Sequence, residues 1–481
     1  MVEPEFTADE SPSKTKRFVE WQLTILASMY AGYAAFMLCR NTLISSSAAM
    51  MLDPSLDLDK ESFGHLMSWH SAGAIAGKLV TGPGADWLGG RRMFLLALSL
   101  TAMANVGFAF GGSFAVFALM NFLGQFAKSG GWPAMTKMVG SWYPEHRYGQ
   151  VWSLISTSSR VGTIGAGLVL GFALSLVSWR SIFLLSAAIT LVVVAVLFFF
   201  LKEEPSDVGL PPLAEPTPPL AEPTSRLAEP KSRLAEPKSR LAEPKSRLAE
   251  PKSLGDDANA SRADHVLDSA NWHEALTAFA RSGRFWSIGF GIVFLTIMMD
   301  FLVFIPIYLS ESLGISGSAA SMAGSSFPAG MFAALLLTSF VYDNLSKRTL
   351  VWALGGMLTL GCGCVIALSN LAFVSESIRS PVAIAVLFLL GLSISPAYYV
   401  PMSVFSVRFG GKHSGMLVSL IDVFGYCGAM LFNFFGGSIA EHYGWSVFLT
   451  GLLAISCLAT LLMTTFLALD ARSARLDIEA A

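Results

Sequence analysis

The sequence has few charged residues. Asp, Glu, Lys and Arg make up 14% of its 481 residues, whereas 53% are hydrophobic. Soluble domains carry about 25% charged residues, so this chain has too little charge to cover a water-facing surface. The formal net charge of −2 indicates no particular partner, and we expect no nucleic acid among the partners.

Cysteine is scarce as well, and motifs of enzyme chemistry are missing. The five cysteines all lie in apolar runs, at no spacing typical of a metal site or a disulfide framework. The sequence has no phosphate-binding loop, no Ser/His/Asp arrangement and no metal-ligand spacing. These absences argue against an enzyme, and we expect no cofactor.

The N-terminal segment lacks the marks of a cleaved targeting sequence. It is polar through Lys16 and Arg17 and carries several acidic residues before them. A secretory signal peptide starts with basic residues before a short apolar core, and a transit peptide has few acidic residues. We therefore expect the first apolar run to act as its own membrane-insertion signal.

Long apolar runs are what the sequence does contain. Each is long enough to cross a bilayer, which takes roughly 20 apolar residues in a helix, and membrane helices tolerate Gly and Pro. The runs predict an all-α membrane protein with twelve transmembrane helices. Six precede a long polar break and six follow it, at about 21–50, 63–85, 92–110, 114–141, 150–176, 180–201, 285–310, 318–342, 349–369, 382–407, 413–437 and 444–470.

These runs divide the chain into five parts. We expect an N-terminal tail (1–20), a six-helix bundle (21–201), a central linker (202–284), a second six-helix bundle (285–470) and a C-terminal tail (471–481). Counted from a cytosolic start, the short inner loops hold seven Lys and Arg residues and the outer loops three. Because cytosolic loops are enriched in Lys and Arg, we predict a multi-pass protein with both termini cytosolic, in the plasma membrane or an endomembrane.

The central linker carries a tandem repeat. Leu-Ala-Glu-Pro occurs six times at a period of seven residues, from Leu213 to Leu248. A seven-residue period is typical of a coiled coil, but a proline in every copy breaks a helix. The repeat therefore predicts a semi-extended, disordered cytosolic tether. After it, Asn271 to Arg284 could form a short surface helix.

One cation lies deep inside the first run. Arg40 is the only formal charge between Trp21 and Met50. An arginine at the centre of a membrane helix costs about 3 kcal/mol, so such residues face a bundle interior or an aqueous cavity. Both ends of the run are too distant for snorkelling to be the better explanation. Tyr33, seven residues earlier, shares its helix face, and we predict that both residues bind substrate.

Further charges lie inside other predicted spans. The first half holds Lys78, Lys128 and Arg160, and the second half holds two acids, Asp300 and Asp422. Converging cations favour an anionic substrate, because Arg and Lys bind phosphate and carboxylate groups. Internal salt bridges are the alternative, above all for Lys128 and Arg160. We expect the two acids to serve in coupling or in ion pairs between the halves.

A turn motif repeats across the polar break. Asp86 and Arg91 follow the second span, and Asp343 and Arg348 follow the eighth at the same spacing. Two six-span halves in one orientation are the parallel repeats of major facilitators, and the turn at Gly82–Arg92 resembles the loop signature of that superfamily. The resemblance implies gating loops that bias inward-open against outward-open states. Simple turn and orientation chemistry is the alternative.

Within that superfamily the chain resembles the organophosphate:phosphate antiporters, which include glycerol-3-phosphate and sugar-phosphate exchangers. The resemblance implies that Arg40 contacts a phosphoryl group. The chain departs from the bacterial members in the seventh span, where Asp300 lies and their arginine is missing, and near Ser159, where they have a histidine. The residues that carry the resemblance are Gly32-Tyr33, Arg40, Lys78, Gly130-Gly-Trp-Pro133, Trp142-Tyr143 and Phe424-Gly-Tyr-Cys-Gly428.

Together, these patterns predict a secondary active transporter that moves a small anionic organic solute by alternating access. The resemblance favours a phosphorylated metabolite exchanged for phosphate. A proton-coupled symporter of a carboxylate, amino acid or drug-like compound is the alternative among transporters. A transport-dead membrane receptor is the alternative of another class. We expect a monomer in the lipid bilayer, with the solute and phosphate or a proton as its partners.

Overall fold

The computed structural model describes residues 12–144, 147–211, 272–341, 346–410 and 414–479. In these ranges the regular structure is helical and no strand occurs. The all-α prediction is therefore confirmed. The Leu-Ala-Glu-Pro repeats lie outside the described residues, so the disordered tether stays a prediction.

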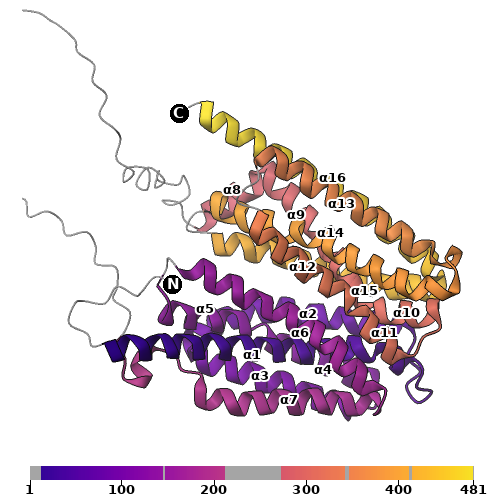
Figure 1. Cartoon of the computed structure of the whole chain (residues 1–481), viewed down its shortest axis with the longest axis horizontal. Coiled ribbons are helices and arrows are strands. Elements are labelled where there is room, and N and C mark those ends of the chain that lie inside the picture. The colour runs from indigo at the N-terminus through magenta and orange to yellow at the C-terminus, as the bar shows by residue number, and fades with distance from the viewer. Residues whose placement is uncertain (1–11, 145–146, 212–271, 342–345, 411–413, 480–481) are drawn as a thin grey trace, which may run out of the picture.

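The first half of the chain forms one bundle, drawn in indigo to magenta in Figure 1. Its apolar runs fold as helices because, in a membrane, a helix satisfies every backbone hydrogen bond internally. Its helices are α1 (Pro12–Met51), α2 (Lys60–Leu88), α3 (Gly90–Ala109), α4 (Phe114–Lys128), α5 (Gly131–Trp142), α6 (Tyr148–Leu174) and α7 (Trp179–Phe200).

The second half forms the other bundle, drawn in red to yellow. The short 3₁₀ helix η3 (Phe301–Val303) continues α9, and η5 (Leu371–Phe373) precedes α14. The α-helices of this half are α8 (Trp272–Arg281), α9 (Gly283–Asp300), α10 (Ile305–Leu313), α11 (Gly317–Gly324), α12 (Ser326–Val341), α13 (Lys347–Ser369), α14 (Glu376–Gly410), α15 (Ser414–His442) and α16 (Gly444–Glu479).

Each of the twelve predicted spans falls on helix. Ten helical stretches of the described residues are long and apolar enough to cross a membrane. The other two predicted spans are α2, which contains several polar residues, and the α4–α5 pair, which is interrupted at Ser129 and Gly130. The terminal helices are longer than their predicted spans, since α1 begins at Pro12 and α16 ends at Glu479.

The segments next to the repeats dock on the bundles. After α7, the 3₁₀ helix η2 (Pro205–Val208) follows Glu203, whose carboxylate accepts hydrogen bonds from the backbone N–H groups of Gly90 and Arg91 at 2.6 and 2.5 Å. A carboxylate at a helix N-terminus stabilises the start of α3. The short helix expected after the repeats is α8, which buries Ala275 and Phe279.

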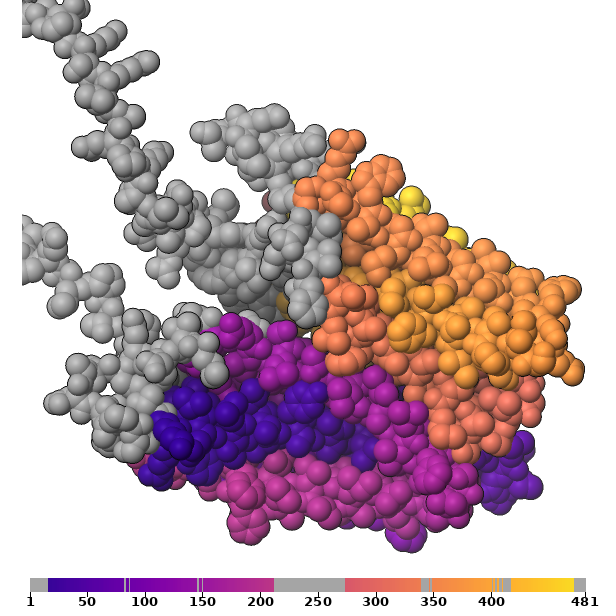
Figure 2. Space-filling view, in the orientation of Figure 1, coloured from indigo at the N-terminus to yellow at the C-terminus, as the bar shows by residue number. Residues whose placement is uncertain are grey.

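The two bundles pack against each other through α2 with α15 and α6 with α11. In Figure 1 they meet at the end opposite the N-terminus of α1, and their ribbons diverge towards that terminus. Figure 2 shows the contact between the purple and orange halves in space-filling form. Glycines make the close approach possible, because a Cβ on Gly64 would lie 2.3 Å from the Asn433 carbonyl oxygen and one on Gly167 2.0 Å from the Ser325 hydroxyl.

Ion pairs hold the same end of the bundles together. The Lys60 ammonium at the start of α2 lies 3.2 Å from the Glu311 carboxylate and 3.3 Å from that of Glu441. Glu311 also accepts a hydrogen bond from the Trp445 indole at 2.7 Å. These charges are partly exposed, so each ion pair contributes little to the stability of the contact.

Candidate functional site

Charged and aromatic side chains converge where the two bundles face each other. From α1, Arg40 and Tyr33 point to one side because seven residues make about two helical turns. The Tyr33 hydroxyl lies within electrostatic range of Arg40, Lys78 and Arg160. The Lys128 ammonium lies 5.8 Å from the centre of the Tyr33 ring. The five residues expected to bind substrate are thus gathered in one region.

The second bundle adds tyrosines and two carboxylates to this region. Arg160 of α6 stacks 4.6 Å from the ring centre of Tyr399 on α14. Lys78 of α2 lies 4.9 Å from the ring centre of Tyr426 on α15. It also forms an ion pair with Asp422, which lies one helical turn before Tyr426 on α15. Aromatic faces stabilise cations, so these contacts hold the charged groups in place.

The other acid has a neutral partner. Asp300 ends α9 and accepts a hydrogen bond from the Asn433 side-chain amide of α15. Asp300 lies within electrostatic range of Arg40, although no ion pair joins Asp300 to a cation among the described residues. Of the two acids, Asp422 alone therefore bonds across the bundles in this part of the chain.

Three of the four cations have no carboxylate partner in the described ranges. Arg160 donates to the Ser159 hydroxyl at 2.7 Å, and its buried Nε has no hydrogen-bond acceptor among the residues that the structure describes. Lys128 is buried, with 8% of its surface exposed. If all groups are ionised, Arg40, Lys78, Lys128 and Arg160 exceed the two acids by two positive charges. A buried surplus of this kind is costly unless a counter-charge is bound.

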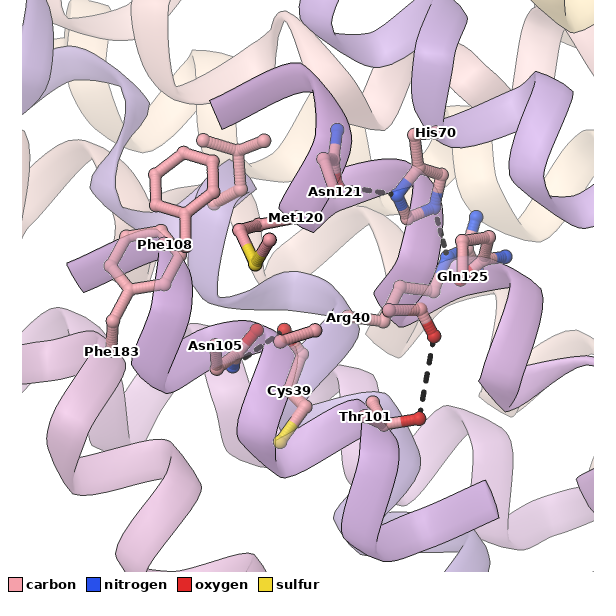
Figure 3. Close-up of a pocket in the computed structure, with 13 residues that line it drawn as sticks. Cys39, Arg40, His70, Thr101, Asn105, Phe108, Met120, Asn121, Gln125 and Phe183 are labelled. Atoms are coloured by element: carbon pink, nitrogen blue, oxygen red, sulfur yellow. Dashed lines mark hydrogen bonds between the residues drawn. The ribbon is translucent and has the colours of Figure 1, made fainter. Parts of the chain in front are cut away.

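Arg40 also contacts His70 inside its own bundle, and His70 in turn contacts Asn121, as Figure 3 shows. Its Nε–H donates to His70 Nε2 at 3.4 Å, and His70 Nδ1 lies 3.0 Å from Asn121 Oδ1. Beside them is a small cavity of about 20 Å³, whose lining includes Arg40, His70, Asn105, Asn121 and Gln125. That is room for about one ordered water. His70 and Lys78 are eight residues apart and so lie on one face of α2, but no pattern in the sequence indicates the contact of His70 with Arg40.

The residues expected in gating loops are only partly described. Arg91 donates from Nε to the Leu201 carbonyl at 2.6 Å and from Nη2 to that of Phe198 at 2.7 Å, so it binds the C-terminal end of α7 within its own bundle. Arg348 is exposed in the first turn of α13. The side chain of Asp86 and the whole of Asp343 lie outside what the structure describes. The gating role therefore stays a prediction.

In the ranges that the structure covers, no group of three or more His, Cys, Asp or Glu side chains is arranged to hold a metal ion. The site instead offers guanidinium, ammonium and phenol donors around an interface between two bundles. Such donors bind anions, since charge-assisted hydrogen bonds to phosphate or carboxylate are about twice as strong as neutral ones.

Comparison with known proteins finds relatives among transport and sensor proteins of membranes. The chain is 22% identical over 451 residues to the "Probable hexose phosphate transport protein" of Chlamydia trachomatis, covering 93% of this chain and 91% of the relative. It is 27% identical over 199 residues to the "Membrane sensor protein UhpC" of Salmonella typhimurium, covering 41% of this chain and 45% of the sensor.

The fold is also found among solved structures. A bacterial homologue of the human lysosomal transporter Spinster, in an inward-facing and unoccupied conformation, superimposes with a TM-score of 0.64 at 16% identity, covering 94% of this chain and 97% of that one. Residues 29–302 and 285–480, which make up most of the chain, match the family described as "Major Facilitator Superfamily". This chain is therefore an integral membrane transporter that belongs to the major facilitator superfamily.

Proposed function

We propose that this transporter exchanges a small phosphorylated metabolite for inorganic phosphate by alternating access. The observation that carries the proposal is the convergence of four basic side chains at the interface of the bundles, namely Arg40, Lys78, Lys128 and Arg160. A phosphate monoester near neutral pH carries a charge of about −1.5 to −2, and arginine and lysine side chains bind such a group. The similarity to a relative named as a hexose phosphate transport protein supports the same solute class.

Arg40 is the principal phosphoryl-binding residue in this proposal. Its planar guanidinium can give two parallel hydrogen bonds to a phosphoryl group. Arg40 also lacks a carboxylate partner among the described residues, so it needs no rearrangement to accept an anion. Lys128 and Arg160 add positive charge around the bound anion, and the Tyr33 hydroxyl is a further hydrogen-bond donor.

Lys78 couples binding to movement of the bundles. In the structure it is held by Asp422 of the opposite bundle. A dianion in the site competes with Asp422 for the Lys78 ammonium, so loaded and empty protein differ in the bond that joins α2 to α15. A ligand shifts a conformational equilibrium only through such differential contacts.

We place both termini in the cytosol, because Lys and Arg are more frequent in the loops on that side. The end of the molecule closed by Lys60, Glu311 and Glu441 then faces away from the cytosol. Asp86, Arg91, Asp343 and Arg348 then lie at the cytosolic ends of their helices, where paired loops would stabilise the opposite state.

Counterflow into proteoliposomes tests the proposal. Vesicles that contain the purified full-length chain are loaded with unlabelled phosphate, and uptake of radiolabelled phosphate, glucose 6-phosphate, glycerol 3-phosphate and a dicarboxylate is measured. We expect rapid uptake of phosphate and at least one phosphorylated solute, only when the lumen contains phosphate. Uptake of the dicarboxylate alone, or uptake without internal phosphate, would contradict the proposal.

A receptor is the second candidate, because one relative is named as a membrane sensor. A receptor binds its ligand without carrying it across. The two functions separate when the thermal unfolding midpoint of the chain and counterflow are measured with the same phosphorylated solute. Stabilisation by the solute together with no counterflow would establish a receptor.

A further inference from the structure

We propose that His70, held in one tautomer by Asn121, positions the Arg40 guanidinium for the anion. His70 is thereby a positioning residue of the substrate site, which it does not itself reach. The inference rests on the proposed function insofar as Arg40 binds the transported anion. The contact between His70 and Arg40 can be tested separately.

The hydrogen bonds determine the state of each partner. The Asn121 amide nitrogen donates to the Leu66 carbonyl at 2.8 Å, so its oxygen is the atom that faces His70. That oxygen accepts from His70, which places the imidazole proton on Nδ1. The other nitrogen, Nε2, then has a free lone pair and accepts from Arg40 Nε–H. These three hydrogen bonds can form together only when His70 is neutral.

The two helices that hold this set are locked at close distance. A Cβ on Gly73 of α2 would lie 2.4 Å from the Phe122 carbonyl oxygen of α4, and one on Gly77 would lie 2.6 Å from that of Phe126. Gly73 is one turn from His70, and Phe122 follows Asn121. The spacing of α2 and α4 therefore fixes the distance between His70 and Asn121, and both side chains act as rigid supports.

The neighbouring cavity explains why support is needed. It lies inside the first bundle, and its polar lining includes Asn105, Gln125 and Thr101. An unsupported guanidinium could turn towards these groups and away from the space between the bundles. By accepting from Nε, His70 leaves the two terminal nitrogens of Arg40 as the fork that faces an anion. Pre-organised donors of this kind lower the cost of binding.

Three variants test the positioning role with inorganic phosphate as the probe. His70→Leu removes the hydrogen-bond acceptor of Arg40 Nε–H, and His70→Gln keeps an acceptor. Asn121→Leu keeps the imidazole but removes the hydrogen bond that fixes its tautomer. We expect His70→Leu to raise KM for phosphate self-exchange by about tenfold, the effect of leaving one buried donor unsatisfied. The KM of His70→Gln should stay within about threefold of the wild-type value, and the KM of Asn121→Leu should lie between those of the two His70 variants. His273→Leu on α8, the same change on an exposed histidine, should leave KM unchanged.

A double-mutant cycle tests the contact itself. The thermal unfolding midpoints of wild type, His70→Leu, Arg40→Lys and the double variant are compared, since residues in contact show non-additive effects. Because Lys has no Nε–H, His70→Leu should cost less in the Arg40→Lys background. Additive effects, or a wild-type KM in His70→Leu, would overturn the proposal. If His70→Leu does not fold, Asn121→Leu decides, and an unchanged KM there overturns it.

Failure of the proposed function would look different. A wild-type chain that exchanges neither phosphate nor glucose 6-phosphate would contradict that function. The stability cycle would then still decide whether His70 holds Arg40.

Discussion

Lys78 and Asp422 form an ion pair that joins the first bundle to the second, from α2 to α15. The residues are 344 positions apart in the sequence, and their side chains are 29% and 23% exposed. The Tyr426 ring lies against the same ammonium group. The pair is therefore partly sheltered from solvent while remaining partly accessible to it.

Lys78→Met should destabilise the protein more than the double variant Lys78→Met/Asp422→Leu. Removing one partner leaves a charge partly buried, which costs about 1–2 kcal/mol here, less than for a fully buried pair. Replacing both partners removes the unpaired charge. Thermal unfolding in detergent measures both variants, and a double variant less stable than Lys78→Met would refute the expectation.

Arg40→Lys should slow phosphate exchange at least about tenfold while insertion and folding survive. Lysine keeps the charge but loses the planar fork, so about 1.4 kcal/mol or more of binding free energy is lost. Exchange rates in proteoliposomes and the unfolding midpoint check the two parts of the expectation. Uptake at the wild-type rate would reduce Arg40 to a structural ion.

Gly64→Ala should impair transport by opposing the packed state of the bundles. The added Cβ would meet the Asn433 carbonyl oxygen, and such overpacking costs about 1–3 kcal/mol. Gly165→Ala is the matched control, because a Cβ there has nothing within 4 Å. Exchange should fall about tenfold in the first variant and stay unchanged in the second. Equal exchange rates in the two variants would show that the close contact between Gly64 and Asn433 is not needed for transport.

Asp300→Asn should separate exchange from accumulation. Asp300 has an amide partner rather than a cation among the described residues, so a proton can neutralise it when an anion is bound. If a proton is coupled to transport, the variant keeps equilibrium exchange but loses uptake driven by a pH gradient. Uptake is compared in vesicles with and without that gradient. Wild-type exchange that is obligatory and insensitive to the gradient would make the two acids structural partners.

Deleting Leu213–Lys252 should leave transport nearly intact. The proline-punctuated repeats are expected to order little and so to contribute little to the folded state. A Gly/Ser segment of the same length, in place of these residues, controls for the reach of the linker. Loss of exchange in the correctly inserted Gly/Ser variant would assign the repeats a role.

The helices follow from local patterns, whereas the partners in the site do not. Continuous apolar runs indicated every span, and the isolated charge of Arg40 indicated the site, because both effects act within a single helix. The interruption at Ser129 and Gly130 was not predicted, although Gly130, Gly131 and Pro133 are helix-breaking residues, because membrane helices tolerate Gly and Pro. The partner of Asp422 depends on how α2 meets α15, and no local pattern encodes that approach.

The same limit applies to His70. His70 is eight residues before Lys78 and so lies on the same face of α2. No pattern in the sequence links His70 to Arg40 of α1. The family resemblance identified Arg40 but is silent on what holds it. The sequence therefore gives no sign that His70 supports Arg40.

The approach of Gly64 to Asn433 has a consequence for the hydration of Asp300. Asn433 donates to Asp300 from its side chain, while its backbone carbonyl is covered by Gly64 of the other bundle. If the bundles part at this end, as the proposed alternating access requires, α2 would withdraw and water would gain a route to that carboxyl from the side of Lys60 and Glu441. Solvent would then reach Asp300 from one side of the membrane in one state and be shut out from that side in the other. Such one-sided access is the condition for a carboxyl group to take up a proton on one face and release it on the other.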